Sequence, residues 1–183
     1  MARVPYLDVS DLAPDDQDLL KRPINLFRAL VHSPGAARGW STIGHYIRHS
    51  SKLDPRLREM AILQVGYLAR APYEWSHHVK IGHDFGVSDD DIRAIIAETE
   101  GHTTTLDPFD KTVLKAARKM ASELAITDAT FAALQEKLDT ELLTDLVLTI
   151  AFYCAVVRVL ATMQIDVEDD YLPYLKQFPL PKD

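Results

Sequence analysis

"LDPRLREMAILQVGYLARAPYEWSHHVKIG", residues 53–82, is the stretch of this sequence that decides the fold. Asp54 and Pro55 predict a helix start, because an aspartate oxygen satisfies free N–H groups of the first turn and a proline at the first helical position loses no hydrogen bond. Apolar residues then recur every three or four positions, as on a helix with one buried face. A turn at Ala71 and Pro72 leads into a second helix. The stretch therefore predicts a helical hairpin.

Helical signals continue outside this hairpin. Asp107 and Pro108 repeat the helix start, and Ser88 with Asp91 predicts a capping box after a helix that ends at Gly86. Alternating β-branched runs bounded by hairpin turns, which would predict strands, do not occur in the sequence. The predicted fold class is therefore all-α.

The length of the chain favours one domain. Its 183 residues, of which 47% are hydrophobic, can bury one sizeable core. We expect a single domain over residues 1–183, with its core at about residues 25–163. Residues 142–163 are apolar on most faces and predict a helix at the centre of the fold or at an oligomer interface.

The two ends of the chain carry different signals. Residues 1–16 lack the apolar segment of a secretory signal, so we expect a cytoplasmic protein. Residues 169–183 contain three prolines and are predicted to be extended. This tail is expected to pack through three aromatic side chains, Tyr171, Tyr174 and Phe178.

The composition excludes several classes of protein. Cys154 is the only cysteine, so the chain has no intrachain disulfide and no Cys-x-x-Cys site. It lies in an apolar helix, which favours a packing role over that of a nucleophile. The apolar run of residues 146–157 is too short to cross a bilayer, so no membrane partner is expected.

Charge is distributed unevenly along the chain. The net charge is −7, yet residues 22–58 hold seven Lys or Arg and a single acid, Asp54. An acidic protein is a poor nonspecific binder of nucleic acid, so no nucleic-acid partner is expected. The basic segment suits a small anion, an acidic neighbour in an oligomer, or a solvated basic face.

Three ionisable side chains of the hairpin are expected to meet. Glu74 and His78 lie four residues apart on one helix face, close enough to share a proton. Across the hairpin, Glu59 approaches the same point. Two carboxyl groups in a partly dry pocket cannot both ionise without cost, so one is expected to hold a proton near neutral pH. The alternative is a surface Glu–His pair, with Glu59 bound to an arginine.

A metal site is a further alternative. His45 and His49 also lie four residues apart, and together with Glu74 and His78 they offer ligands that suit zinc, iron or manganese. No compact His-Glu-x-x-His signature supports this site, so we expect no metal and no cofactor. Trp75 is expected either to line a ligand pocket or to belong to the core.

Three segments together resemble a known family. They read "NLFRALVHSP", "LDPRLREMAILQVGYLARAPYEWSHHVKIGHDFGVSDDDI" and "LTIAFYCAVVRVLATM", and they resemble the carboxymuconolactone decarboxylase family over residues 25–163. The resemblance implies an alkylhydroperoxidase D-like helical bundle. It also implies a homo-oligomer, commonly a trimer or hexamer, with its sites near subunit contacts.

The peroxidases of the same superfamily provide a contrast. Their site is a Glu, a Cys-x-x-Cys pair and a His four residues after the second Cys, and the corresponding positions here hold Glu59, Ala71, Glu74 and His78. Both thiols are missing. A dithiol peroxidase must form a disulfide between those two positions, so thiol peroxidase activity is excluded.

The resemblance implies a function as well. We expect a cofactor-free lyase of aromatic compound catabolism that decarboxylates a small carboxylated lactone or a related organic acid. His78 would act as the general acid, Glu74 would set its tautomer and charge, and Glu59 would relay protons to solvent. The residues expected to bind the substrate are His45, Arg56, Arg58, Tyr73 and Trp75.

One departure from the family keeps two other hypotheses open. Family members often carry Phe-Tyr-Asn in the long helix and a second Asn further on, where this chain has Cys154 and, at about the second position, Ala161. The missing amides favour a noncatalytic or regulatory oligomer that binds a small organic acid. The third hypothesis is a metal-dependent enzyme.

Overall fold

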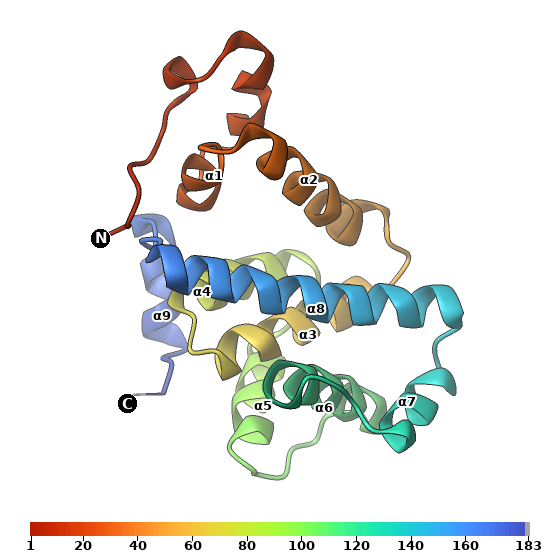
Figure 1. Cartoon of the computed structure of the whole chain (residues 1–183). Helices are drawn as coiled ribbons and strands as arrows, with labels where there is room; N and C mark the ends of the chain where they lie inside the picture. Colours follow the sequence, from red (N-terminus) through yellow and green to blue (C-terminus); the bar gives the residue numbers. More distant parts are fainter. Residues whose placement is uncertain (182–183) are drawn as a thin grey trace.

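Helix α3 (Pro55–Leu68) lies at the centre of the computed structural model, which describes residues 1–181 (Figure 1). Asp54 Oδ1 accepts a hydrogen bond from the backbone N–H of Leu57 at 2.9 Å, which confirms the predicted helix start. Every residue from Arg58 to Tyr67 is buried, because α3 packs against several other helices of the bundle. Residues 182–183 of the predicted domain and tail lie outside the described residues.

The predicted helical hairpin is confirmed. Helix α4 (Pro72–Asp84) follows α3 after a short turn in which Arg70 adopts a positive φ of 48°. The two helices approach closely at Gly66, where an added Cβ would lie 3.4 Å from the backbone nitrogen of Trp75. This close approach places side chains of α3 directly against those of α4.

The segment after the hairpin also follows the sequence signals. Gly86, with φ of 90°, comes two residues after the end of α4. Ser88 and Asp91 form the reciprocal capping box that starts α5 (Asp89–Thr99). Helix α6 (Pro108–Glu123) begins at the predicted proline.

Helix α8 (Thr140–Met163) is the longest helix of the described chain and runs across the bundle (Figure 1). One side packs against α3, α4, α6 and α7 (Asp128–Gln135). The other side is exposed and includes Leu148, Ala151 and Ala155. By length and composition alone α8 is also apolar enough to cross a membrane.

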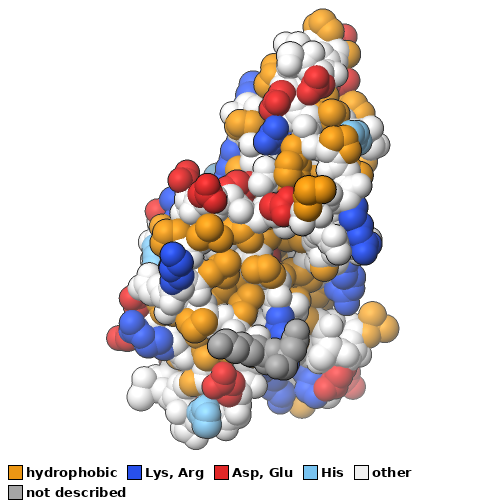
Figure 2. Space-filling view, turned by 90° about the vertical axis from the view of Figure 1, so that its left-hand side faces the viewer, with side chains coloured by type: hydrophobic (Ala, Val, Ile, Leu, Met, Phe, Trp, Pro, Cys, Tyr) orange, Lys and Arg blue, Asp and Glu red, His pale blue; other side chains and the backbone are white. Residues whose placement is uncertain are grey.

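The N-terminal part of the chain stands beside α8 and forms a narrower projection above the bundle (Figure 2). It contains two short 3₁₀ helices, two α-helices and one π-helical turn. These elements are η1 (Val9–Asp11), η2 (Pro14–Leu20), α1 (Asn25–Leu30), α2 (Pro34–His45) and the π-helical turn η3 (Tyr46–Ser50).

The expectation of an extended tail is wrong. The tail forms a 3₁₀ turn, η4 (Asp169–Tyr171), and a short helix, α9 (Leu172–Gln177). Its first internal proline falls in the first turn of α9, where proline is tolerated. The predicted packing is present, because Phe178 is buried and its carbonyl accepts a hydrogen bond from Trp75 Nε1 at 2.8 Å.

Candidate functional site

Glu59 on α3 holds the imidazole of His78 on α4. Glu59 Oε2 accepts a hydrogen bond from His78 Nδ1 at 2.7 Å, and Glu59 Oε1 accepts one from Arg58 Nε at 3.0 Å. Burial raises the pKa of Glu59, but the attraction of His78 and Arg58 outweighs it, so the pKa lies below its ordinary value. Because the charged carboxylate requires a proton on Nδ1, it leaves Nε2 of His78 facing away from Glu59.

Glu74 meets the other nitrogen of the same ring. Its Oε1 lies 3.1 Å from His78 Nε2. The contact does not have hydrogen-bond geometry, and Glu74 Oε1 is a buried oxygen without a hydrogen-bond partner. Burial raises the pKa of Glu74, and the negative charge of Glu59 adds to this effect, while His78 and Arg48 oppose it. The two carboxyl groups therefore have opposite tendencies, and Glu74 is the one that retains a proton more readily.

The cluster borders a partly enclosed pocket between α4, α8 and the N-terminal part. The volume open to the centre of a water molecule is about 60 Å³, several times the volume that one water needs. Glu74, His78, Arg22 and Arg48 contribute polar groups. Apolar walls come from Leu26, Phe27, Trp40, Ile81, Phe152 and Val156. The arrangement can exchange protons with a small ligand that is shielded from bulk water.

Tyr153 of α8 is a pocket residue that the sequence reasoning did not select. Its ring meets the ring of His78 edge to face, with centroids 4.9 Å apart. Burial raises the pKa of Tyr153, and the charges of Glu74 and Glu59 add to this, so the phenol stays neutral. The only signal for it was its place in the Phe-Tyr pair of the family pattern.

His77 also borders the pocket, although the helical spacing placed it on another face from His78. It is stacked between Tyr73, at 4.0 Å between ring centroids, and Tyr171, at 3.5 Å. His77 Nε2 lies 3.1 Å from Glu168 Oε2. Burial lowers the pKa of His77 despite this carboxylate. The tail thus contacts the pocket residue His77 through Tyr171 and Glu168.

Of the five predicted substrate-binding residues, the pocket includes Tyr73 alone. Trp75 is fully buried and packs in a second apolar cluster with Phe178. Arg58 lies behind Glu59, with its guanidinium over the ring of Phe85. These positions were not foreseeable, because helical spacing gives the face of a residue but not the element that covers it.

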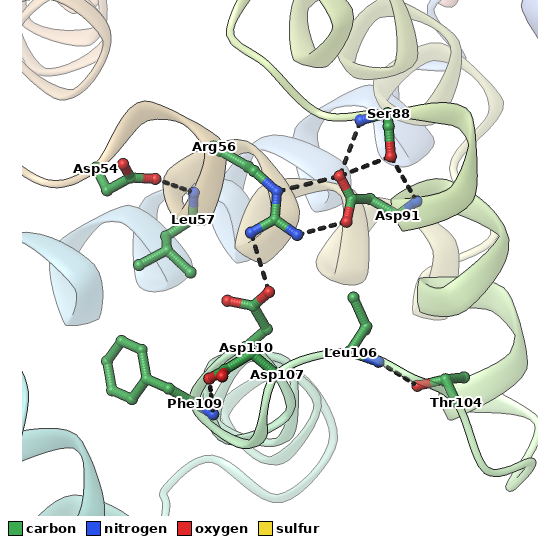
Figure 3. A network of polar contacts seen from close by, with 10 residues as sticks. All are labelled: Asp54, Arg56, Leu57, Ser88, Asp91, Thr104, Leu106, Asp107, Phe109 and Asp110. Atoms are coloured by element: carbon green, nitrogen blue, oxygen red, sulfur yellow. Dashed lines mark hydrogen bonds and ion pairs between the residues drawn. The ribbon is translucent and has the colours of Figure 1, made fainter.

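Arg56 serves the fold instead of the pocket. Its guanidinium joins three helices by binding Asp91 of α5 bidentately and Asp110 of α6, the latter at 2.9 Å (Figure 3). These carboxylates satisfy the guanidinium, so it is not available to a ligand at the cluster of Glu59 and His78.

The four residues of the metal hypothesis are not brought together. His45 borders a separate surface hollow with Asp18 and Arg38. His49 borders an outer cleft, and neither imidazole is part of the pocket that holds Glu74 and His78. Within residues 1–181, no group of three or more His, Cys, Asp or Glu side chains is arranged to hold a metal ion.

Comparisons with known proteins give one family match and several shared folds. Residues 34–101 match the model of the carboxymuconolactone decarboxylase family. This match covers just over a third of the chain, and it lies within the stretch that carries the resemblance to this family. Among curated proteins, none matches the sequence.

Several solved structures share the fold. An alkylhydroperoxidase AhpD core, an uncharacterized peroxidase-related protein from Ralstonia eutropha JMP134, aligns with 99% of this chain and 98% of its own, at 19% identity and a TM-score of 0.81. An uncharacterized peroxidase-related protein from Silicibacter sp. TM1040 aligns with 93% of this chain and 95% of its own, at 16% identity and a TM-score of 0.74. A variant of the debrominase Bmp8, in complex with 2,3,4-tribromopyrrole, aligns with 97% of this chain and 100% of its own, at 18% identity and a TM-score of 0.79. At these identities, the likeness shows the fold alone.

The residue that borders the pocket from the start of α4 is Glu74, at a position that the resemblance to the peroxidases singles out. Glu74 occupies the position of the second thiol in the peroxidase pattern, and the first thiol is replaced by Ala71. The positions of the missing family amides point elsewhere. Cys154 and Ala161 border a different hollow on the far side of α8, together with Arg158. Their side chains do not contribute to the pocket of this subunit.

Proposed function

We propose that the protein is a cofactor-free lyase that removes carbon dioxide from a small carboxylated lactone or a related organic acid. The observation that carries this proposal is the buried contact of Glu59, His78 and Glu74 at the wall of a partly enclosed pocket. The match of residues 34–101 to the carboxymuconolactone decarboxylase family supports a decarboxylase-like reaction, and the absence of both thiols removes the peroxidase cycle.

The proposed reaction needs one proton and no external electrons. The bond between the ring carbon and the departing carboxylate breaks, carbon dioxide leaves, and the electron pair moves into a conjugated carbonyl of the substrate to give an enolate. The pair formed by His78 Nε2 and Glu74 then delivers one proton to carbon. Because the substrate itself accepts the electron pair, the proposal requires no cofactor.

Each cluster residue has a separate role in this proposal. Glu74 and His78 border the pocket and act on the substrate. Glu59 is fully buried and is a positioning residue that fixes the tautomer of His78. This reverses the two roles that the sequence suggested for the acids, because a carboxylate with no exposed surface cannot pass protons directly to solvent. The neutral phenol of Tyr153 is available to donate a hydrogen bond to the enolate oxygen.

The main competing function is the noncatalytic binder of an organic acid. It was favoured by the missing amides, and Cys154 and Ala161 lie outside the pocket. The missing amides therefore have no bearing on chemistry at His78.

Ultraviolet absorbance of γ-carboxymuconolactone, followed after addition of the purified protein, tests the proposal. We expect turnover by the wild type and a fall of at least about 100-fold in kcat for His78→Ala, which removes the proton-transfer group. Full activity of His78→Ala would show that the assignment is wrong. Ligand-induced thermal stabilisation without turnover of any lactone acid would favour the noncatalytic binder.

A further inference from the structure

The basic segment of residues 22–58 divides into paired and unpaired side chains. Five of its seven basic residues form ion pairs with carboxylates of other segments or of a neighbouring residue. These pairs are Arg28–Asp8, Arg38–Asp18, Lys52–Glu141, Arg56–Asp91 and Arg58–Glu59. Most of the positive charge of the segment is therefore paired within the fold.

The two that remain are Arg22 and Arg48. Arg48 lies in the π-helical turn η3, and its Nε donates to the carbonyl of Gly44 at 3.2 Å, one turn earlier. Arg22 immediately precedes Pro23 and is exposed. Neither guanidinium forms an ion pair in the part of the chain that the structure describes. Both border the pocket that contains His78 and Glu74.

The same two arginines also border a second, more open space. In this outer cleft, the volume open to the centre of a water molecule is about 350 Å³. The cleft shares Arg22, Arg48 and Ile81 with the inner pocket. The two spaces therefore adjoin at these residues. Lys80, also in the outer cleft, is already paired with Asp84 at 2.7 Å. Arg22 and Arg48 thus form a basic neck between the cleft and the inner pocket.

An unpaired guanidinium in such a position has a defined ligand chemistry. Its planar fork of N–H groups matches a carboxylate, and the attraction is strongest where water is partly excluded. Glu74 is the carboxyl group of the inner pocket. Since burial raises the pKa of Glu74, it neutralises the arginines less than an ordinary carboxylate would. The neck therefore has positive charge available for an anion that enters from the cleft.

We propose that Arg22 and Arg48 bind a carboxylate that the substrate keeps throughout the reaction, while the compact body of the substrate occupies the inner pocket against His78 and Glu74. This assignment rests on the proposed lyase function. A carboxylate held by two guanidinium groups is stabilised in the ground state, which opposes its departure as neutral carbon dioxide. The departing group must therefore lie deeper, and the ligand is a lactone or oxo-acid with an acidic group besides the one that leaves.

Binding of a saturated probe tests the assignment without turnover. The probe is 5-oxotetrahydrofuran-2-carboxylate, which lacks a conjugated carbonyl, and its neutral amide is the matched ligand control. Calorimetric titration is expected to show that the acid binds and that the amide binds roughly tenfold more weakly or worse. We expect Arg22→Met and Arg48→Met each to weaken binding of the acid by roughly tenfold or more.

The protein offers a matched control variant. Arg158 is exposed and, like Arg48, bonds to a carbonyl one turn earlier in its own helix, but it borders the hollow on the far side of α8. Arg158→Met is expected to bind the acid like the wild type. Within residues 1–181 the Arg22 side chain forms no hydrogen bond or ion pair, so Arg22→Met tests the neck even if Arg48→Met folds poorly.

The outcomes separate this assignment from the lyase proposal. The assignment is wrong if folded Arg22→Met and Arg48→Met proteins bind the acid like the wild type. It is also wrong if the wild type binds acid and amide with equal affinity, or binds neither. If the acid binds through both arginines but no lactone acid is turned over, the lyase proposal fails and the anion site stands.

Discussion

At the scale of single residues, one imidazole has two carboxyl neighbours with opposite surroundings. Glu59 has hydrogen-bond donors at both oxygens, from His78 and Arg58. Glu74 has a buried oxygen with no hydrogen-bond donor. The first environment favours the charged form of a carboxyl group and the second favours the neutral form. Their effects on stability should therefore differ in sign.

Glu59→Gln is expected to lower the free energy of unfolding by about 3–5 kcal/mol, because it leaves a buried guanidinium without its counter-charge. In the folded protein the pKa of Glu59 lies below its ordinary value of 4.5, so the stabilisation it gives is present above that pH and is lost as pH falls. Urea unfolding at several pH values measures both effects. The matched control is Glu141→Gln, an exposed partner of Lys52, with an expected cost below about 1 kcal/mol.

Glu74→Gln is expected to have the opposite effect on stability at neutral pH. Because burial raises the pKa of Glu74, the folded state holds this proton above pH 4.5 while the unfolded chain releases it, so stability falls as pH rises through that range. The glutamine variant avoids this loss and should unfold at a higher urea concentration than the wild type at pH 7, with turnover of the lactone abolished. A less stable Glu74→Gln protein would contradict the assignment of a neutral Glu74.

At the scale of helices, one arginine of α3 bonds to both α5 and α6. Arg56 reaches Asp91 and Asp110 from one guanidinium (Figure 3). From the sequence pattern alone, Arg56 was expected to bind the substrate. The pattern cannot distinguish a substrate-binding arginine from one that forms a structural ion pair. Its partners are 35 and 54 residues away, and their proximity results from helix packing.

Arg56→Met distinguishes the two roles. We expect a loss of about 1–2 kcal/mol in unfolding free energy, less than for a fully buried pair because 32% of the Arg56 side chain is exposed. The KM for the lactone should remain that of the wild type. A large rise in KM with unchanged stability would instead return Arg56 to the list of substrate-binding residues.

At the scale of the whole molecule, the partly enclosed pocket depends on segments that are far apart in sequence. The hairpin supplies Glu74 and His78, α8 supplies Tyr153, and Arg22 and Arg48 come from the N-terminal part. The tail adds Tyr171, which stacks on His77. The pocket therefore forms only when these distant segments pack together.

Assembly is the prediction that belongs to this scale. The exposed side of α8 carries Leu148, Ala151 and Ala155, which supports the proposal of a homo-oligomer, a trimer or a hexamer. Sedimentation velocity at micromolar concentration should give a multiple of the 20.6 kDa chain. Leu148→Asp is expected to shift the distribution towards smaller species. A wild-type protein that sediments as a 20.6 kDa species at every concentration would contradict this proposal.

The sequence by itself determined the features that depend on near neighbours along the chain. Caps at Asp54 and Ser88, the hairpin at Pro72 and the shared face of Glu74 and His78 follow from helical periodicity and local hydrogen bonding, which act over only a few residues. The meeting of Glu59 with His78 was also foreseeable, since a short turn forces two helices together.

Only the tertiary structure decided burial and charge pairing. The roles of Glu59 and Glu74, the place of Tyr153 in the pocket and the helical form of the tail depend on contacts between distant segments. The same is true of the arginines, because any of 20 basic residues can pair with any of 27 acids, and among residues 1–181 folding leaves Arg22 and Arg48 without an ion pair at the pocket. These features cannot be predicted from the pattern of residue types, because tertiary packing determines which charged groups are desolvated.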